Sequence, residues 1–135
     1  MSSPPIRRVV TGDDSEGRSF FVEDGPSPAV REVPQRPGYR VTNLWRTVGA
    51  SPPVDAPDSI AAHQGVAPPP GGTVLRVIDF PPEPQDPQEL ERMLHATFAS
   101  MYRDAQHTPR PGEHPGMHRT ATVDYALMLQ GELVA

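Results

Sequence analysis

The hydrophobic and polar positions of this chain predict a β-rich fold with one helix. Short runs of β-branched and aromatic residues alternate with Gly, Pro, Asp and Ser turn signals, which is typical of strands. We expect the first two strands, separated by a turn at residues 11–14, to form a hairpin or two successive edge strands. The strands are expected at residues 6–10, 17–24, 29–33, 39–47 and 73–80.

Two of these strands have faces that can be assigned, because successive side chains of a strand point to opposite sides. One face of the fourth strand is expected to carry Tyr39, Val41, Asn43 and Trp45. One face of the fifth should carry Val74, Arg76, Ile78 and Phe80, and the other Thr73, Leu75, Val77 and Asp79. Since both faces of the fifth strand carry apolar residues, we expect it to be covered on both sides.

Residues 87–104 are predicted to form the one long helix. Asp86 suits the N-cap, Pro87 suits the first helical position, and Glu89 completes a capping-box-like pattern. The helix is expected to pack on the sheet through residues at helical spacing, namely Leu90, Met93, Leu94, Thr97, Phe98 and Met101.

The composition favours one domain with a modest core and long loops. The chain has 135 residues, of which 36% are hydrophobic, and it contains 19 prolines and 11 glycines. Residues 49–72 are the richest in proline and glycine, so we expect a surface excursion that is partly polyproline II. His63 lies in this excursion without evident partners, and we assign it no role.

Charge and cysteine content exclude several function classes. The net charge is -5, all basic residues are scattered arginines, and phosphate-backbone binding needs clustered positive charge, so nucleic acid is not an expected partner. The absence of cysteine excludes disulfides, thiolate nucleophiles and cysteine-based zinc sites. No apolar run is long enough for a signal peptide or a membrane span, so we expect a cytoplasmic protein without a membrane partner.

The segment from His114 to Glu132 combines a histidine, a carboxylate and a strand signal within a few residues. A turn at Pro115–Gly116 leads into β-favouring residues, and a glycine turn at Gly131 closes them. From the residues alone, His118 is equally suited to a pocket or to a hydrogen bond that orders the turn. If Asp124 is buried it needs a partner, which Arg119 or Arg76 could supply.

This segment resembles the first conserved motif of the cupin superfamily. That motif has a glycine, then His-x-His, a glutamate, and a glycine seven residues after it; Gly116, His118, Thr120, Asp124 and Gly131 occupy these positions here. Residues 38–47 and 68–83 are similar to a subgroup of small single-domain cupins from bacteria and fungi, so the resemblance covers nearly the whole chain. It implies a cupin-like jelly roll (double-stranded β-helix) over residues 1–135, with residues 116–135 as the first motif.

The resemblance also implies a site inside the barrel, although its metal ligands are altered. Thr120 stands where the second histidine belongs and Asp124 where the glutamate belongs, so only His118 and Asp124 are candidate ligands for Fe, Mn, Ni or Zn. We therefore expect no cofactor, or a divalent metal as the alternative. The candidate pocket residues are His118, Thr120, Asp124, Trp45, Tyr125 and Arg76.

The second cupin motif is absent from the sequence, which ends at Ala135, so we expect an incomplete barrel. The sequence is then a fragment, a shortened relative, or a chain whose barrel a second chain completes, for example in a homodimer. Three functions remain open: a protein that binds a small organic molecule without a complete metal triad, a metal-dependent oxidoreductase, isomerase or decarboxylase, and an interaction module. Some cupins of this subgroup sit beside small-molecule pathways and are labelled oxidoreductases, which suggests secondary metabolism.

Overall fold

The computed structural model describes residues 4–134, and the fold is mainly β. The five strands expected between residues 6 and 80 and the predicted helix are present, with ends that differ by at most three residues. The elements are β1 (Arg7–Asp13), β2 (Ser19–Pro26), β3 (Ala29–Glu32), β4 (Arg40–Arg46), the short 3-10 helix η1 (Ile60–Ala62), β5 (Val74–Asp79) and α1 (Pro87–Met101).

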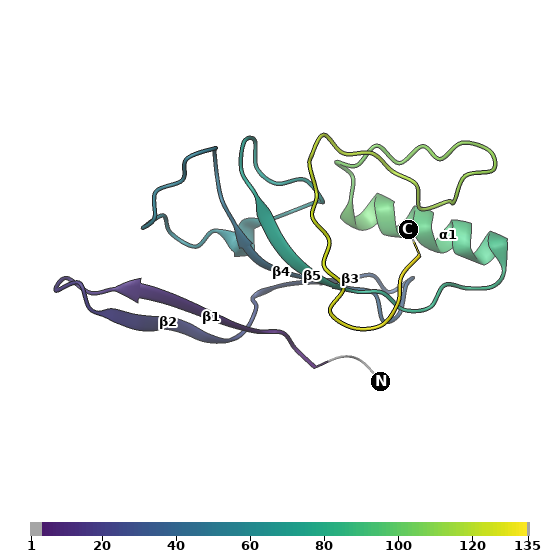
Figure 1. The fold of residues 1–135 in the computed structure, drawn as a ribbon. Coiled ribbons are helices and arrows are strands. Elements are labelled where there is room, and N and C mark those ends of the chain that lie inside the picture. The colour runs from purple at the N-terminus through teal and green to yellow at the C-terminus, as the bar shows by residue number, and fades with distance from the viewer. Residues whose placement is uncertain (1–3, 135) are drawn as a thin grey trace.

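The strands form two antiparallel sheets. The pairing of β1 with β2 confirms the hairpin, with a bulge between Val10 and Thr11. The predicted turn at residues 11–14 is wrong, because residues 11–13 still pair with β2 and the turn lies at residues 14–18. The second sheet has the order β3-β4-β5. Figure 1 shows α1 beside the three-stranded sheet, while the hairpin extends away at the other end of the molecule. The described residues thus form two antiparallel sheets with one helix against the larger sheet. This arrangement is a β-rich fold, and it does not by itself establish a jelly roll.

The helix packs on one side of the three-stranded sheet, as its apolar face predicted. Tyr39 and Val41 of the sheet form a buried cluster with Phe98 and Tyr102, and Ile78 packs against it. The predicted N-cap is confirmed, because the Asp86 side chain accepts a hydrogen bond from the Gln88 amide at 3.0 Å.

The helix ends three residues earlier than predicted because Asp104 has another role. The carboxylate of Asp104 accepts hydrogen bonds from the backbone amides of Val66 and Ala67, at 3.0 Å and 2.8 Å. Tyr102 is the C-cap, and its amide still bonds to the Phe98 carbonyl. The turn after the helix is therefore fixed to the proline-rich segment by contacts that no local pattern contains.

A β-bulge in β4 corrects the predicted faces of that strand. Asn43 is opposite Arg76, but Trp45 is opposite Leu75, so one extra residue is inserted between them. Because residues opposite each other share a face, Trp45 lies on the side of Leu75, away from Val41 and Asn43. The prediction that Trp45 shares their face is wrong, since strict alternation holds only in an unbulged strand.

Two further predictions about burial need correction. The proline-rich segment is more than a surface excursion, because Ile60 is fully buried and His63 is 2% exposed. Conversely, β5 is not covered on both sides: Leu75, on the face away from α1, is 61% exposed. The apolar residues on both faces of β5 predicted two covering layers, and the described residues supply only one.

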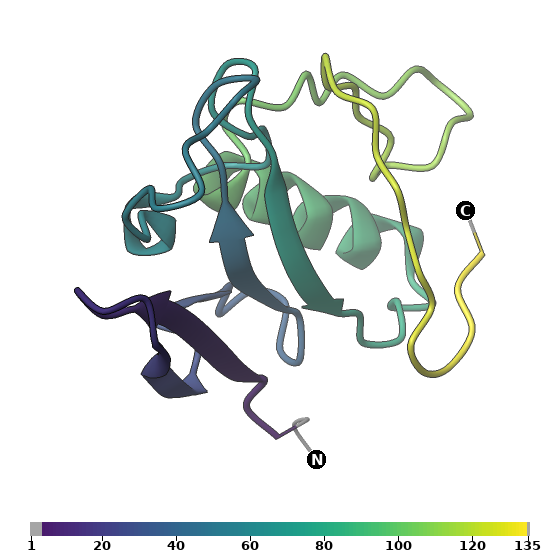
Figure 2. The same cartoon turned by 60° about the vertical axis from the view of Figure 1, so that its left-hand side comes forward.

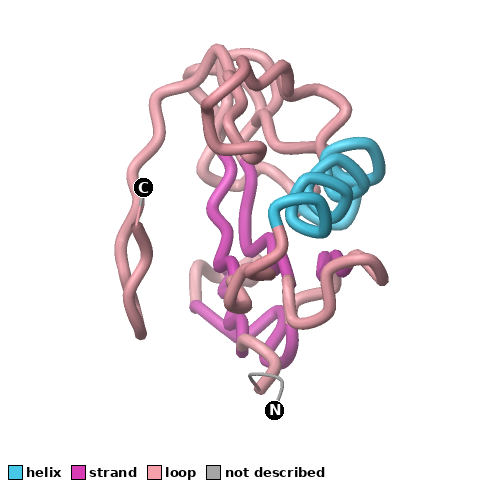
Figure 3. Tube along the Cα trace, turned by 90° about the vertical axis from the view of Figure 1, so that its right-hand side faces the viewer, coloured by secondary structure: helices cyan, strands magenta, loops and turns pink. Residues whose placement is uncertain are grey.

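The C-terminal segment, residues 120–134, does not form the predicted strand. Just before this segment, Arg119 forms an isolated antiparallel β-bridge with Gln106. Figure 2 shows the segment (yellow) on the β5 side of the molecule, and Figure 3 shows it standing apart from the magenta strands. A strand needs a partner for its backbone groups, and none of the described residues supplies one.

Arg8 joins the hairpin to the rest of the molecule. Its side chain is 6% exposed and forms ion pairs with Glu23 and Asp58, both at 2.7 Å. It also donates a hydrogen bond to the backbone carbonyl of Leu44 at 3.1 Å. One guanidinium therefore contacts β2, the segment before η1, and β4.

We predict that Arg8→Ala lowers the free energy of unfolding by about 2–3 kcal/mol, because it leaves two partly exposed carboxylates without their shared cation. Urea denaturation followed by circular dichroism measures this loss. Arg7→Ala is the matched control, since Arg7 forms its 2.6 Å ion pair with Asp24 on the surface and should matter much less. Equal losses in the two variants would contradict the role assigned to Arg8.

Candidate functional site

The side of the three-stranded sheet that faces α1, which we call the inner face, is unusually polar. Its strands contribute Tyr39, Asn43 and Arg76. His63 and Tyr102 lie against it from the proline-rich segment and from the end of the helix. Buried polar groups must find partners to offset their lost hydration, so the contacts of each define what the face can bind.

Arg76 is the cation at the centre of the inner face. Its Nη2 donates to the Val66 carbonyl at 2.8 Å and lies 3.3 Å from Nε2 of His63. Burial lowers the pKa of Arg76, while nearby Tyr102, Tyr39, Asp104 and Asp124 partly offset this. No carboxylate in residues 4–134 forms an ion pair with Arg76. It retains unused donor capacity in a partly dehydrated setting.

Two tyrosines flank this cation. The hydroxyls of Tyr39 and Tyr102 are 2.7 Å apart, and both side chains are buried. Burial raises the pKa of Tyr39 and of Tyr102 above their ordinary value, so both hydroxyls remain protonated. A pair of neutral hydroxyls can both donate and accept, but neither is a ready general base.

Asn43 is the neighbour of Arg76 across the strand pair. The two residues are directly opposite, so their side chains share the inner face. Asn43 is 3% exposed, and its Nδ2 lies 3.4 Å from the Ala29 carbonyl. Its Oδ1 is buried and has no hydrogen-bond partner in the part of the chain described. An unused acceptor therefore lies beside an unpaired cation.

The C-terminal motif residues do not belong to this cluster: His118 and Asp124 are exposed, and Thr120 is half-buried. His118 Nδ1 is 2.9 Å from the Gly116 carbonyl, which can only accept, so Nδ1 donates and Nε2 is left free. This is the turn-ordering hydrogen bond foreseen as one reading of His118. The Thr120 hydroxyl is 2.8 Å from that of Thr122.

Asp124 and Tyr125 also lie at the surface. Asp124 forms no ion pair with Arg119 or Arg76 in residues 4–134, but its charge does raise the pKa of Arg76. Tyr125 is 95% exposed, so it is neither packed nor in a pocket here. Trp45, half-buried on the opposite side of the sheet, cannot line one pocket with Arg76.

Several histidines gather near the helix. The His107 ring stacks on Phe98 at a centroid distance of 3.9 Å, and the His118 ring packs on Phe98 at 4.9 Å. His107 Nε2 also donates to the Pro115 carbonyl at 2.7 Å. Within residues 4–134 no three His, Asp or Glu side chains are grouped so that they could hold a metal ion. The described geometry thus brings His118 against Phe98 and does not gather a metal-ligand set around His118.

Sequence reasoning identified Arg76 but missed His63, Asn43 and the tyrosine pair. Asn43 carried a usable signal, because an asparagine in a strand among apolar residues needs a specific partner. His63 carried none, since its burial depends on Arg76, which follows it by thirteen residues through an irregular loop.

Comparisons of the chain with protein-family models, curated proteins and solved structures found no match. Among the described residues, no helix has the length and apolar character needed to cross a membrane.

We predict that the stability of the fold falls as the pH drops below about 6.5, the ordinary pKa of histidine. Burial, and next the positive charge of Arg76, lower the pKa of His63, so the folded state keeps the ring neutral while the unfolded chain takes up a proton. The contribution of His63 is complete above the unfolded pKa and is lost as the pH falls towards the lower folded value.

Thermal unfolding between pH 5 and pH 7.5 measures this dependence, and His63→Gln should flatten it. His95→Gln is the control, because His95 is exposed on the helix and should leave the slope unchanged. A slope that survives in His63→Gln would place the titrating group elsewhere.

Proposed function

We propose that this chain is a cupin-like domain that binds a small organic molecule at the inner face of its sheet. The observation that carries the proposal is the cross-strand pair of Asn43 and Arg76. Among residues 4–134, the buried Oδ1 of Asn43 has no hydrogen-bond partner and the guanidinium of Arg76 has no carboxylate partner. A ligand with a hydroxyl beside an oxygen acceptor would satisfy both.

The neighbouring groups support a polar organic ligand. The hydroxyls of Tyr39 and Tyr102 can exchange donor and acceptor roles, and the neutral ring of His63 can do the same. Ile78, which is partly buried on the same face, supplies an apolar side chain beside these polar groups. Precise polar groups on an apolar wall are the usual composition of a small-molecule site.

Binding without a complete metal triad remains our preferred form of this proposal. His118 keeps Nε2 free for a ligand or metal, but Thr120 uses its hydroxyl on Thr122, and Asp124 is exposed. In the alternative, a metal-dependent enzyme, His118 and Asp124 would hold the ion, which would polarise a substrate oxygen.

The test is a screen of small hydroxylated organic acids, phenols and sugars by NMR on isotope-labelled protein. We expect binders to shift the signals of Asn43 and His63 but not the Trp45 indole, which lies on the other side of the sheet. Arg76→Gln should weaken their binding about tenfold, since a charge-assisted hydrogen bond is lost. Arg110→Gln, an exposed position, is the control.

The metal-dependent alternative is separated in the same experiment. Stoichiometric Fe, Mn, Ni or Zn in the purified protein that disappears in His118→Ala would replace our proposal by that alternative. Binding that Arg76→Gln leaves intact, in a variant shown by circular dichroism to be folded, would also refute the inner-face site.

A second candidate function, an interaction module, is favoured by the exposed apolar row of the C-terminal segment. Alternate residues carry large apolar side chains that are between 77% and 95% exposed, and such a row is a template for strand pairing. The residues are Val123, Tyr125, Leu127 and Leu129. The occupant we propose is a second copy of the chain, whose own row is identical and can pair with it.

In that case the protein should be a dimer, and the double variant Leu127→Asp/Leu129→Asp should be a monomer. Light scattering during size-exclusion chromatography over a range of concentrations measures this. Val54→Asp is the matched control, because Val54 is a fully exposed valine in the proline-rich segment. A monomer at every concentration would contradict the pairing of two copies.

A further inference from the structure

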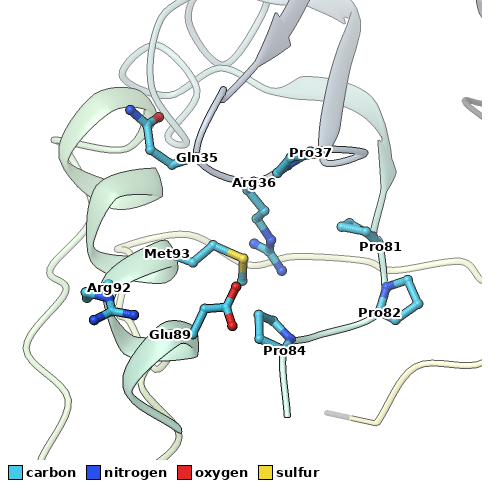
Figure 4. A pocket seen from close by; sticks show the side chains of 9 residues that line it. All are labelled: Gln35, Arg36, Pro37, Pro81, Pro82, Pro84, Glu89, Arg92 and Met93. Carbon is cyan, nitrogen blue, oxygen red and sulfur yellow. The ribbon is translucent and has the colours of Figure 1, made fainter. Parts of the chain in front are cut away.

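A cleft lies between the first half of α1 and the proline-rich chain that follows β5. Its volume is about 430 Å³, within the range that small organic ligands occupy. Four prolines and a methionine form most of its wall: Pro37, Pro81, Pro82, Pro84 and Met93. Figure 4 shows these side chains around the cleft, with the Arg36 side chain extending into it from the turn between β3 and β4.

Arg36 is the feature that distinguishes this cleft from a packing gap. The residue is only 6% exposed, and its Nε is buried without a hydrogen-bond partner. In the part of the chain described, its guanidinium forms no ion pair. A buried charge without a partner is costly, so the site is energetically incomplete as it stands.

The aromatic contacts of Arg36 orient it without satisfying it. Its guanidinium carbon lies 4.3 Å from the centre of the Tyr39 ring and 5.8 Å from that of Phe80. The two rings meet edge to face at 5.5 Å, so they form a fixed platform under the cation. Stacking uses the flat face of a guanidinium and leaves its N–H edge available, and that edge matches a carboxylate in two-point geometry.

The charges around the cleft set the charge of the ligand. Arg92 also lines the cleft and adds a second positive charge, while Glu89 adds one negative charge. The lining therefore carries a net charge of +1, which a single carboxylate balances. A second carboxylate would face Glu89, and like charges at short range repel.

We propose that this cleft binds a small monocarboxylic acid with an apolar body, with its carboxylate on the N–H edge of Arg36 and its body against the prolines and Met93. The cleft is separate from the cross-strand pair of Asn43 and Arg76, so it is an additional site. The two sites share Tyr39, whose ring supports Arg36 and whose hydroxyl meets Tyr102 at the inner face.

The test uses phenylacetate as probe, phenylacetamide as its uncharged counterpart, and inorganic phosphate as an anion without an apolar body. Titration calorimetry should give a dissociation constant for phenylacetate about tenfold lower than for phenylacetamide, the effect of one charge-assisted contact. Phosphate should bind more weakly than phenylacetate. Equal binding of acid and amide, or tighter binding of phosphate, would overturn the proposed ligand class.

Variants locate the site and separate it from the inner face. Arg36→Gln should remove the preference for the acid, whereas Arg31→Gln, an exposed arginine of β3, should keep it. Because loss of Arg36 could disturb the Tyr39 platform, Met93→Trp gives a second test: it fills the cleft, leaves Arg36 in place, and should abolish binding of both probes.

Arg76→Gln should leave phenylacetate binding unchanged, so failure at one site is distinguishable from failure at the other. Glu89→Gln should tighten phenylacetate binding by removing the like charge. Binding that survives both Arg36→Gln and Met93→Trp, or that Glu89→Gln weakens, would overturn the assignment to this cleft.

Discussion

Buried guanidinium groups join the elements of this protein, because its apolar core is too small to do so alone. In the described part of the chain, four residues form the buried hydrophobic cluster between sheet and helix. Arg8 instead connects the hairpin, β4 and the segment before η1. Arginine suits this role since it keeps its charge when buried and offers five donors in a planar fork. The chain has no lysine, so every side-chain cation apart from histidine has this geometry.

The buried and partly buried arginines differ in whether a carboxylate balances their charge. Arg8 and Arg40 form ion pairs with carboxylates, and their contacts account for their burial as structural. Arg36 stacks on the Tyr39 ring and Arg76 donates to the Val66 carbonyl, but neither has a carboxylate partner among the described residues. Since a folded chain gains nothing from an unbalanced buried charge, these two positions are where a ligand would stabilise the protein most. The presence or absence of a carboxylate partner distinguishes the structural arginines from those proposed to face a ligand. No sequence motif makes this distinction.

Local patterns were enough to predict the strands, the hairpin and the helix with its Asp86 cap, because each depends on neighbours a few residues away. They were not enough for the site. The bulge at Leu44 moves Trp45 to the other side of the sheet. No glycine or proline in this strand indicates the bulge in the sequence. The burial of His63 depends on a contact with Arg76 across an irregular loop. Periodicity carries no information about such pairings, so the composition of the inner face could not be read from the sequence.

The C-terminal segment shows that a strand-like sequence pattern does not by itself produce a strand. Its alternating apolar residues have the pattern of a strand, yet a strand exists only when its backbone groups are paired, and here the apolar side chains remain exposed. Asp124 already contributes to the electrostatic environment of Arg76 although it forms no ion pair with it. Pairing this segment with another strand would bury the apolar row and reduce the hydration of Asp124, which would strengthen its attraction to Arg76. If two copies pair as proposed, strand pairing and the charge balance of the inner face would therefore be coupled.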